Sequence, residues 1–125
     1  MKVEDLSMQI ILYAGNAKAF LHEALHDARN GQWENTEANR EKASAELLKA
    51  HKIQTKFLQK DAAEKLASPP ILLIHAQDHL MTVMSEKDLI GEMIHMYKNQ
   101  HDMKKQIEQL LQNEKRQEER SGEKL

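Results

Sequence analysis

Apolar residues recur at intervals of three and four along the first thirty positions, which is the spacing of one face of an α-helix. The members of this stripe are Ile10, Ala14, Ala17, Leu21, Ala24 and Ala28. Most of them are alanines, so neighbouring helices can approach this face closely. The pattern predicts a first helix from about Glu4 to Asn30, and the pair Asn30-Gly31 is typical of a helix C-terminus followed by a turn.

A second helix is predicted from Trp33 or Thr36 to about Lys65. Two neighbouring stripes at helical spacing run along it. The first consists of Ala43, Leu47, Ala50, Gln54 and Phe57, and the second of Leu48, His51, Thr55 and Leu58. Trp33, the only tryptophan, is expected to anchor the start of this helix. The run Ser68-Pro69-Pro70 then ends one helix and allows the next to begin, because proline is tolerated in the first turn.

The third helix is predicted from Ile71 to at least Lys98 and has two apolar faces. The face expected to pack within the subunit consists of Leu73, Ala76, Leu80, Val83, Ile90, Ile94 and Tyr97. The second face places Ile74, Met81 and Ser85 beside Asp78. Isoleucine and methionine around a carboxylate make a poor solvent-facing surface, so we expect a subunit interface there. A carboxylate buried in such an interface needs a partner.

The chain continues well past Lys98, and residues 99–125 differ in character from residues 1–98. Met96, Gln100, Met103, Ile107 and Leu110 follow at intervals of four, three, four and three, which prolongs the helix and is typical of a coiled-coil seam. After Leu111 the sequence offers almost nothing to bury. We therefore predict one three-helix domain over 1–98, followed over 99–125 by a helical extension and a charged, frayed tail.

Composition narrows the class of protein. The 125 residues are 40% hydrophobic and 30% charged, with a formal net charge of -2, so no strong field attracts nucleic acid or an anionic membrane. The absence of cysteine excludes disulfides and thiolate chemistry. The N-terminus lacks the apolar core of a signal peptide, and no apolar run is long enough to span a membrane. We expect a soluble, helical protein.

The candidate chemistry lies at the start of the third helix, where His75, Asp78 and His79 fall within one turn. Residues three and four apart share a helix face, so both Asp78 and His79 are neighbours of His75. A single histidine on such a helix is usually an ordinary surface residue. The combination of two imidazoles and a carboxylate suits metal binding or phosphoryl and proton transfer, and the spacing alone does not choose among these.

Three stretches carry a resemblance to a known family. HAQDHLMT, from His75 to Thr82, resembles the active-site signature of the lactose/cellobiose-type enzyme IIA proteins, the phosphocarriers of the bacterial sugar phosphotransferase system. IILYAGNA, from Ile10 to Ala17, and AHKIQT, from Ala50 to Thr55, resemble the motifs of the family's first and second helices. The resemblance covers roughly Met8 to Tyr97. The sequence departs from it at Ser68-Pro69-Pro70, where the family often has a longer loop.

The resemblance implies an all-α fold, an antiparallel three-helix bundle assembled as a homotrimer through the third helices. It implies that His75 is the phosphoacceptor and that Asp78 lies on the threefold axis, where three copies share a divalent metal, expected to be Mg²⁺. Gln77 and His79 are candidates to contact the phosphoryl oxygens, and His51 is a candidate to orient His75 or the phosphoryl group.

The same resemblance implies the partners. The donor would be the phosphorylated histidine phosphocarrier protein, and the acceptor would be the cysteine of a matching enzyme IIB. A cytoplasmic location follows, with the membrane involved only indirectly through the enzyme IIC permease. The sugar is not specified, because the carrier does not bind it. Gly15, in the first motif, is either a packing glycine or a point where another backbone or the phosphate approaches closely.

Two other classes of function stay open. One is a helical metalloprotein or hydrolase in which His75, Asp78 and His79 bind one metal within a subunit, with His51 or His22 as a further ligand. The other is a non-catalytic coiled-coil adaptor, suggested by the long third helix and the charged tail. Phosphorylation of His75 would separate the carrier from both alternatives.

Overall fold

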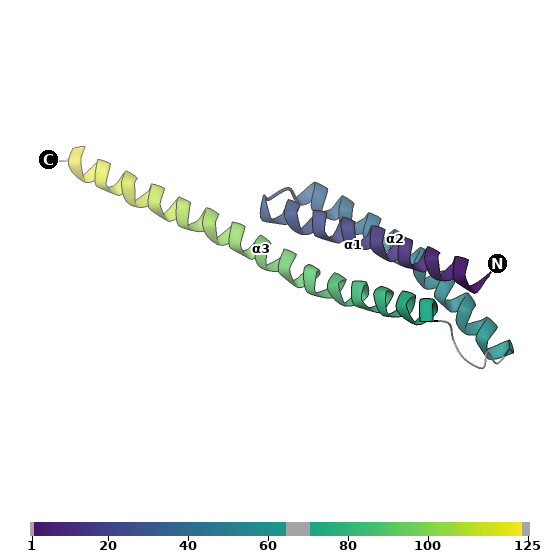
Figure 1. Cartoon of the computed structure of the whole chain (residues 1–125). Helices are drawn as coiled ribbons and strands as arrows, with labels where there is room; N and C mark the ends of the chain where they lie inside the picture. Colours follow the sequence, from purple (N-terminus) through teal and green to yellow (C-terminus); the bar gives the residue numbers. More distant parts are fainter. Residues whose placement is uncertain (1, 65–70, 124–125) are drawn as a thin grey trace.

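The protein is all-α, as the sequence predicted. The structure is a computed structural model that describes residues 2–64 and 71–123 as three long helices (Figure 1). Helix α1 is Val3–Arg29, α2 is Trp33–Glu64 and α3 is Ile71–Glu123. The observed ends of α1 differ by one residue from the predicted ends. The predicted break at Ser68-Pro69-Pro70 and the predicted end of the second helix at Lys65 lie outside the described residues.

The three helices run up, down and up, so that α3 follows the direction of α1 (Figure 1). Helix α1 packs extensively against both other helices, whereas α2 and α3 have few contacts with each other. The reason lies in the α1 stripe, which is completely buried and mostly alanine, so that both neighbours can approach it closely. The larger side chains that fill the core are Ile10, Leu21, Phe57, Leu80 and Val83.

The turn between α1 and α2 forms as its sequence predicted. Gly31 has φ +72°, a left-handed backbone conformation that favours glycine. The Gln32 N–H donates to the Asp27 carbonyl at 2.8 Å and the Gly31 N–H to the Ala28 carbonyl at 3.1 Å, so the last carbonyls of α1 are paired. This turn sets α2 antiparallel to α1.

Polar contacts hold α3 beside α1 along most of the bundle. The Glu86 carboxylate lies 3.6 Å from Lys18 Nζ and 3.4 Å from His22 Nε2. Closer to the α1–α2 turn, Arg29 Nε donates to the Tyr97 hydroxyl at 3.1 Å. His101 then marks the end of the bundle: its Nε2 lies 3.1 Å from the Arg29 carbonyl oxygen.

The ring of His101 meets the edge of Trp33 at 5.4 Å between ring centroids, with an interplanar angle of 85°. Trp33 therefore anchors the start of α2, as expected, and it does so partly against α3. From Asp102 to Gly122 every side chain of α3 is exposed. The helix leaves the bundle there and projects alone (Figure 1).

The C-terminal part of α3 differs from the expectation of a frayed tail after Leu111. The helix continues to Glu123. Residues 112–120 consist almost entirely of glutamine, glutamate, lysine and arginine, which have high helix propensity even where nothing packs against them. The division into a 1–98 domain and a separate 99–125 segment stays a prediction.

Candidate functional site

The cluster predicted from the sequence lies on the first three turns of α3. His75 and Asp78 are exposed, whereas Gln77 and His79 are half-buried. The rings of His75 and His79 are nearly parallel, with an interplanar angle of 12° and 6.4 Å between centroids. The helix thus places two imidazoles side by side at the surface, and that of His75 is exposed.

The buried neighbours explain this orientation. Ala76 and Leu80 are completely buried and Leu73 nearly so, which directs the intervening polar residues outward. The Thr82 hydroxyl donates to the Asp78 backbone carbonyl at 2.8 Å. The Asp78 carboxylate itself has no side-chain hydrogen bond or ion pair with residues 2–59 or 71–122, the part of the chain whose side chains are described.

The surface around Asp78 is apolar. Ile74 is 46% exposed and Met81 57% exposed, one turn before and one turn after the carboxylate. A single chain therefore leaves exposed the face that the sequence predicted to be an interface. An unpartnered carboxylate set in apolar surface is the arrangement that a symmetric assembly with a shared cation would use.

His51 lies elsewhere on the subunit. It is exposed on α2 and lines an open groove of about 540 Å³ together with Met81, Met84 and Ser85 of α3. At about 100° per residue, Met81 and His75 point in directions roughly 120° apart around α3. Within one subunit His51 therefore faces a different side of α3 from His75, while His79 is the histidine beside it.

The structure does not form the metal site that the sequence left open within one subunit. Among the residues that the structure describes, no three histidine, aspartate or glutamate side chains are grouped closely enough to hold a metal ion. His22, one of the proposed further ligands, is instead paired with Glu86. His75, Asp78 and His79 have no further metal ligand beside them among the side chains that the structure describes.

Gly15 is not a packing glycine within the subunit. A Cβ atom placed there would meet no atom of the described residues within 4 Å. The glycine is half-buried on α1, and the space next to it is open in the isolated chain. The alternative, a close approach by another backbone or by the phosphate, stays a prediction.

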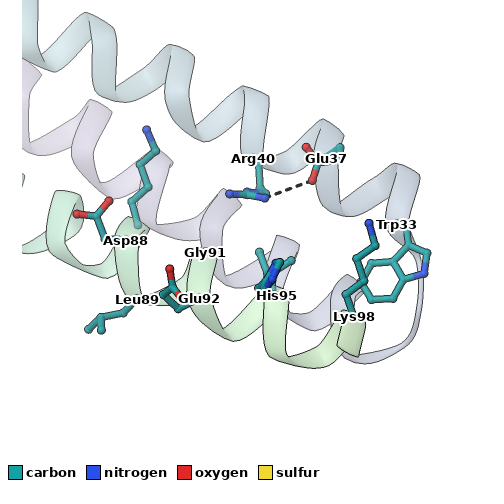
Figure 2. A pocket seen from close by; sticks show the side chains of 11 residues that line it. Trp33, Glu37, Arg40, Asp88, Leu89, Gly91, Glu92, His95 and Lys98 are labelled. Carbon is teal, nitrogen blue, oxygen red and sulfur yellow. Dashed lines mark hydrogen bonds and ion pairs between the residues drawn. The ribbon is translucent and has the colours of Figure 1, made fainter. Parts of the chain in front are cut away.

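A second, larger cavity of about 760 Å³ lies between α2 and α3, toward the α1–α2 turn (Figure 2). Its walls carry charges of both signs, and Arg40 pairs with Glu37 across 3.3 Å. None of the candidate residues lines it. The cavity results from the sparse contact between α2 and α3.

Sequence reasoning missed two polar anchors, Glu86 and His101. Glu86 contacts α1 through Lys18 and His22. Its position one residue after the predicted interface stripe was a weak indication of such a contact. His101 continues the spacing of the buried face beyond Tyr97, at an interval of four, but it lies past the predicted domain end.

No helix among the described residues is long and apolar enough to cross a membrane.

Comparison with known proteins gives a consistent result for most of the chain. Residues 5–98 match the family described as the lactose/cellobiose-specific IIA subunit of the phosphotransferase system (PTS). The match therefore ends close to where α3 leaves the bundle.

Curated relatives cover the same part. The lichenan-specific phosphotransferase enzyme IIA component of Bacillus subtilis (strain 168) is 38% identical over 96 residues, which are 77% of this chain and 87% of the relative. The N,N'-diacetylchitobiose-specific EIIA component of Escherichia coli (strain K12) is 34% identical over 96 residues, with 77% and 83% covered.

Solved structures agree with the fold. The PTS cellobiose-specific enzyme IIA from Bacillus anthracis superposes with a TM-score of 0.76 at 36% identity, covering 82% of this chain and 94% of that chain. The chitobiose IIA protein of Escherichia coli, solved in complex with HPr, gives a TM-score of 0.73 at 32% identity, with 81% and 98% covered. The chain belongs to the lactose/cellobiose-specific enzyme IIA family of the phosphotransferase system.

Proposed function

We propose that His75 accepts a phosphoryl group from the histidine phosphocarrier protein HPr and passes it to the cysteine of an enzyme IIB. The observation that carries the proposal is the exposed imidazole of His75 at the start of α3, within the motif HAQDHLMT and beside the nearly parallel ring of His79. The choice of donor is supported by the Escherichia coli relative, whose structure is a complex with HPr. We place this relay in the cytoplasm.

The transfer needs positioning more than a strong base. A ring nitrogen of neutral His75 attacks the phosphorus, a nitrogen–phosphorus bond forms, and the bond to the donor histidine breaks in line with it. The transition state spreads negative charge over the equatorial oxygens. His79, one turn after His75 on the same face of α3, and Gln77, two residues after His75, are the proposed donors to those oxygens. Each hydrogen bond to a charged oxygen is worth about 1.5–3 kcal/mol.

The position of His75 near the beginning of α3 also favours the phosphorylated state. Side chains on a helix lean toward its N-terminus, so the His75 ring lies over the first turn. The N–H groups in the first turn of an α-helix carry a partial positive charge, which stabilises an anion by roughly 0.3–1 kcal/mol at an exposed site. The helix itself thus contributes to holding the phosphoryl group.

The surroundings of His75 suit a protein partner. Ile71, one turn before His75, is 84% exposed, so an apolar side chain stands beside the acceptor histidine at the surface. Both HPr and enzyme IIB must bring their own reactive residue to within bonding distance of His75. An exposed apolar rim allows either protein to dock and exclude water during transfer.

We further propose that three copies assemble through the Asp78 face of α3 and that the three carboxylates bind one Mg²⁺ ion. Carboxylate oxygens suit such a hard cation, and the Asp78 carboxylate has no competing partner within the described chain. The cation would offset the repulsion among three like charges. It would act in assembly, while the phosphoryl transfer itself would use His75 and its neighbours. The groove at His51, which includes Met81 one turn after Asp78, would then face a neighbouring subunit.

The test is incubation with phosphoenolpyruvate, the general phosphotransferase enzyme I and HPr. We expect a phosphoryl adduct that is labile in acid and stable in base, as phosphohistidine is. The adduct should be lost on addition of a matching enzyme IIB. An adduct stable in acid, or no adduct with fully phosphorylated HPr, would contradict the proposal.

A further inference from the structure

The part of α3 beyond the bundle has an apolar face with no partner in the described chain. Met103 is 61% exposed, Ile107 55%, Leu110 68% and Leu111 60%. All other residues from 100 to 112 are polar or charged. The face is therefore a narrow stripe on an otherwise hydrophilic helix, and α1 and α2 end too early to cover it (Figure 1).

This stripe continues the face of Asp78. At about 100° per residue, Met96 lies five full turns after Asp78 and points in nearly the same direction. On the same reckoning Met103, Ile107 and Leu110 lie within about 40° of that direction. A groove of about 470 Å³ runs along the stripe, lined by Met96, Asn99, Gln100, Met103, Lys104 and Ile107. The face therefore passes without a break from the family domain into the extension.

We infer that residues 99–111 form a parallel three-stranded coiled coil with the same residues of two other copies of this chain. The inference rests on the proposed trimer, whose threefold axis it extends. If three Asp78 residues meet on an axis, three α3 helices run in the same direction around it. The residues that continue the Asp78 face then meet their own counterparts, as rotational symmetry requires.

The spacing and the charges favour copies of this chain over another occupant. Intervals of three and four from Met96 to Leu110 are those of a coiled-coil seam. Between residues 99 and 123 there are six acidic and five basic residues, so parallel copies do not repel and no oppositely charged partner is favoured. The next seam position is Glu114, which ends the apolar contact after Leu111.

The extension also needs a partner on physical grounds. Most of the stability of helices in proteins comes from packing of an apolar face, and here that face is exposed. Packing of the stripe among three copies would bury the exposed isoleucine and leucines and hold the helix in place. The coiled coil would thus act as a stalk that strengthens the trimer at a distance from His75.

Single cysteines provide a direct test, because the natural chain contains none. In the full-length protein at micromolar concentration, Ile107→Cys should form disulfide-linked dimers on mild oxidation, with the third chain of each trimer left unlinked. Lys105→Cys is the matched control, because it points roughly 160° away from Ile107 around the helix. We expect its linkage to be slower by about tenfold or more, since its cysteines face outward.

A second pair of variants measures the contribution to assembly. Ile107→Asp should raise the concentration at which the trimer dissociates by at least about tenfold, because three apolar side chains lose their burial. Gln109→Asp, on the opposite side of the helix, should leave that concentration within about twofold.

The outcomes separate the stalk from the trimer. The coiled coil is contradicted if the wild-type protein has trimeric mass but Ile107→Cys shows no preferential linkage and Ile107→Asp has no effect. That result would remain compatible with the Asp78 trimer. A wild-type protein of monomeric mass overturns both. Phosphoryl uptake by His75, measured on the same samples, reports separately on the carrier function.

Discussion

The two halves of α3 differ in how many faces they use. Between Ile71 and His101 the helix buries one face against α1 and exposes another that carries Asp78, with His75 beside it. Between Asp102 and Glu123 the buried face is gone and every described side chain is exposed. The face that persists across the boundary is the Asp78 face. The first half of α3 therefore contributes to the core and holds the candidate histidines. The Asp78 face continues through both halves and is the proposed assembly surface.

A core substitution should separate the halves most strongly. Leu80, completely buried in the bundle half, should lose about 2–5 kcal/mol of unfolding free energy on Leu80→Ala, because a cavity remains. Leu110→Ala in the projecting half should cost far less per subunit and should instead weaken assembly. Urea unfolding of both variants at high and low protein concentration measures this. Equal losses of unfolding free energy in the two variants, independent of protein concentration, would contradict the proposed difference between the two halves of α3.

The next effect concerns the carboxylate on the shared face. In the proposed trimer, Asp78→Leu would remove three converging charges, a change that is often neutral or stabilising by about 1–4 kcal/mol when the site is buried and apolar. We expect a trimer whose melting temperature no longer responds to chelator, unlike that of the wild type. Asp102→Leu, away from the stripe, is the control and should keep the wild-type response. A monomeric Asp78→Leu protein would contradict the assembly proposed here.

The neighbours of His75 should affect rate and not fold. His79→Ala and Gln77→Ala should each slow phosphoryl transfer from HPr by about 10- to 100-fold, the loss of one hydrogen bond to a charged oxygen. His101→Ala, at the far end of the bundle, is the comparison and should leave the rate unchanged. Rapid-quench measurement of phosphoryl uptake decides the matter. Rates for His79→Ala and Gln77→Ala equal to wild type would remove both residues from the site.

The smallest effect is expected at Gly15. Alanine is favoured over glycine in a helix interior by about 1 kcal/mol, and a Cβ atom would meet nothing within 4 Å in the subunit. Gly15→Ala should therefore raise subunit stability by up to about 1 kcal/mol while slowing transfer. A more stable variant with full activity would show that nothing outside the chain approaches this glycine.

Much of the fold could be predicted because its signals are local. The alanine-rich stripe of α1 and the Asn30-Gly31 turn are periodic or conformational features, and both formed as predicted. The histidine cluster followed from helical spacing. The spacing did not identify the chemistry of the cluster, and the hypothesis of phosphoryl transfer came from the eight-residue motif.

The features that could not be predicted depend on how the helices are placed relative to one another. The stripe on α2 did not show that α2 and α3 would barely touch, or that His51 would face a groove on a different side of α3 from His75. The helix beyond Leu111 was underestimated, because a lack of apolar residues was given more weight than helix propensity.

The central claim is that His75 is the residue that carries the phosphoryl group. Intact mass spectrometry of wild type and His75→Ala, after incubation with phosphorylated HPr, tests it directly. Wild type should gain one phosphoryl mass per chain, and His75→Ala should gain none while keeping its helix content and assembly mass. An undiminished adduct on His75→Ala would assign the chemistry to another histidine and contradict the account.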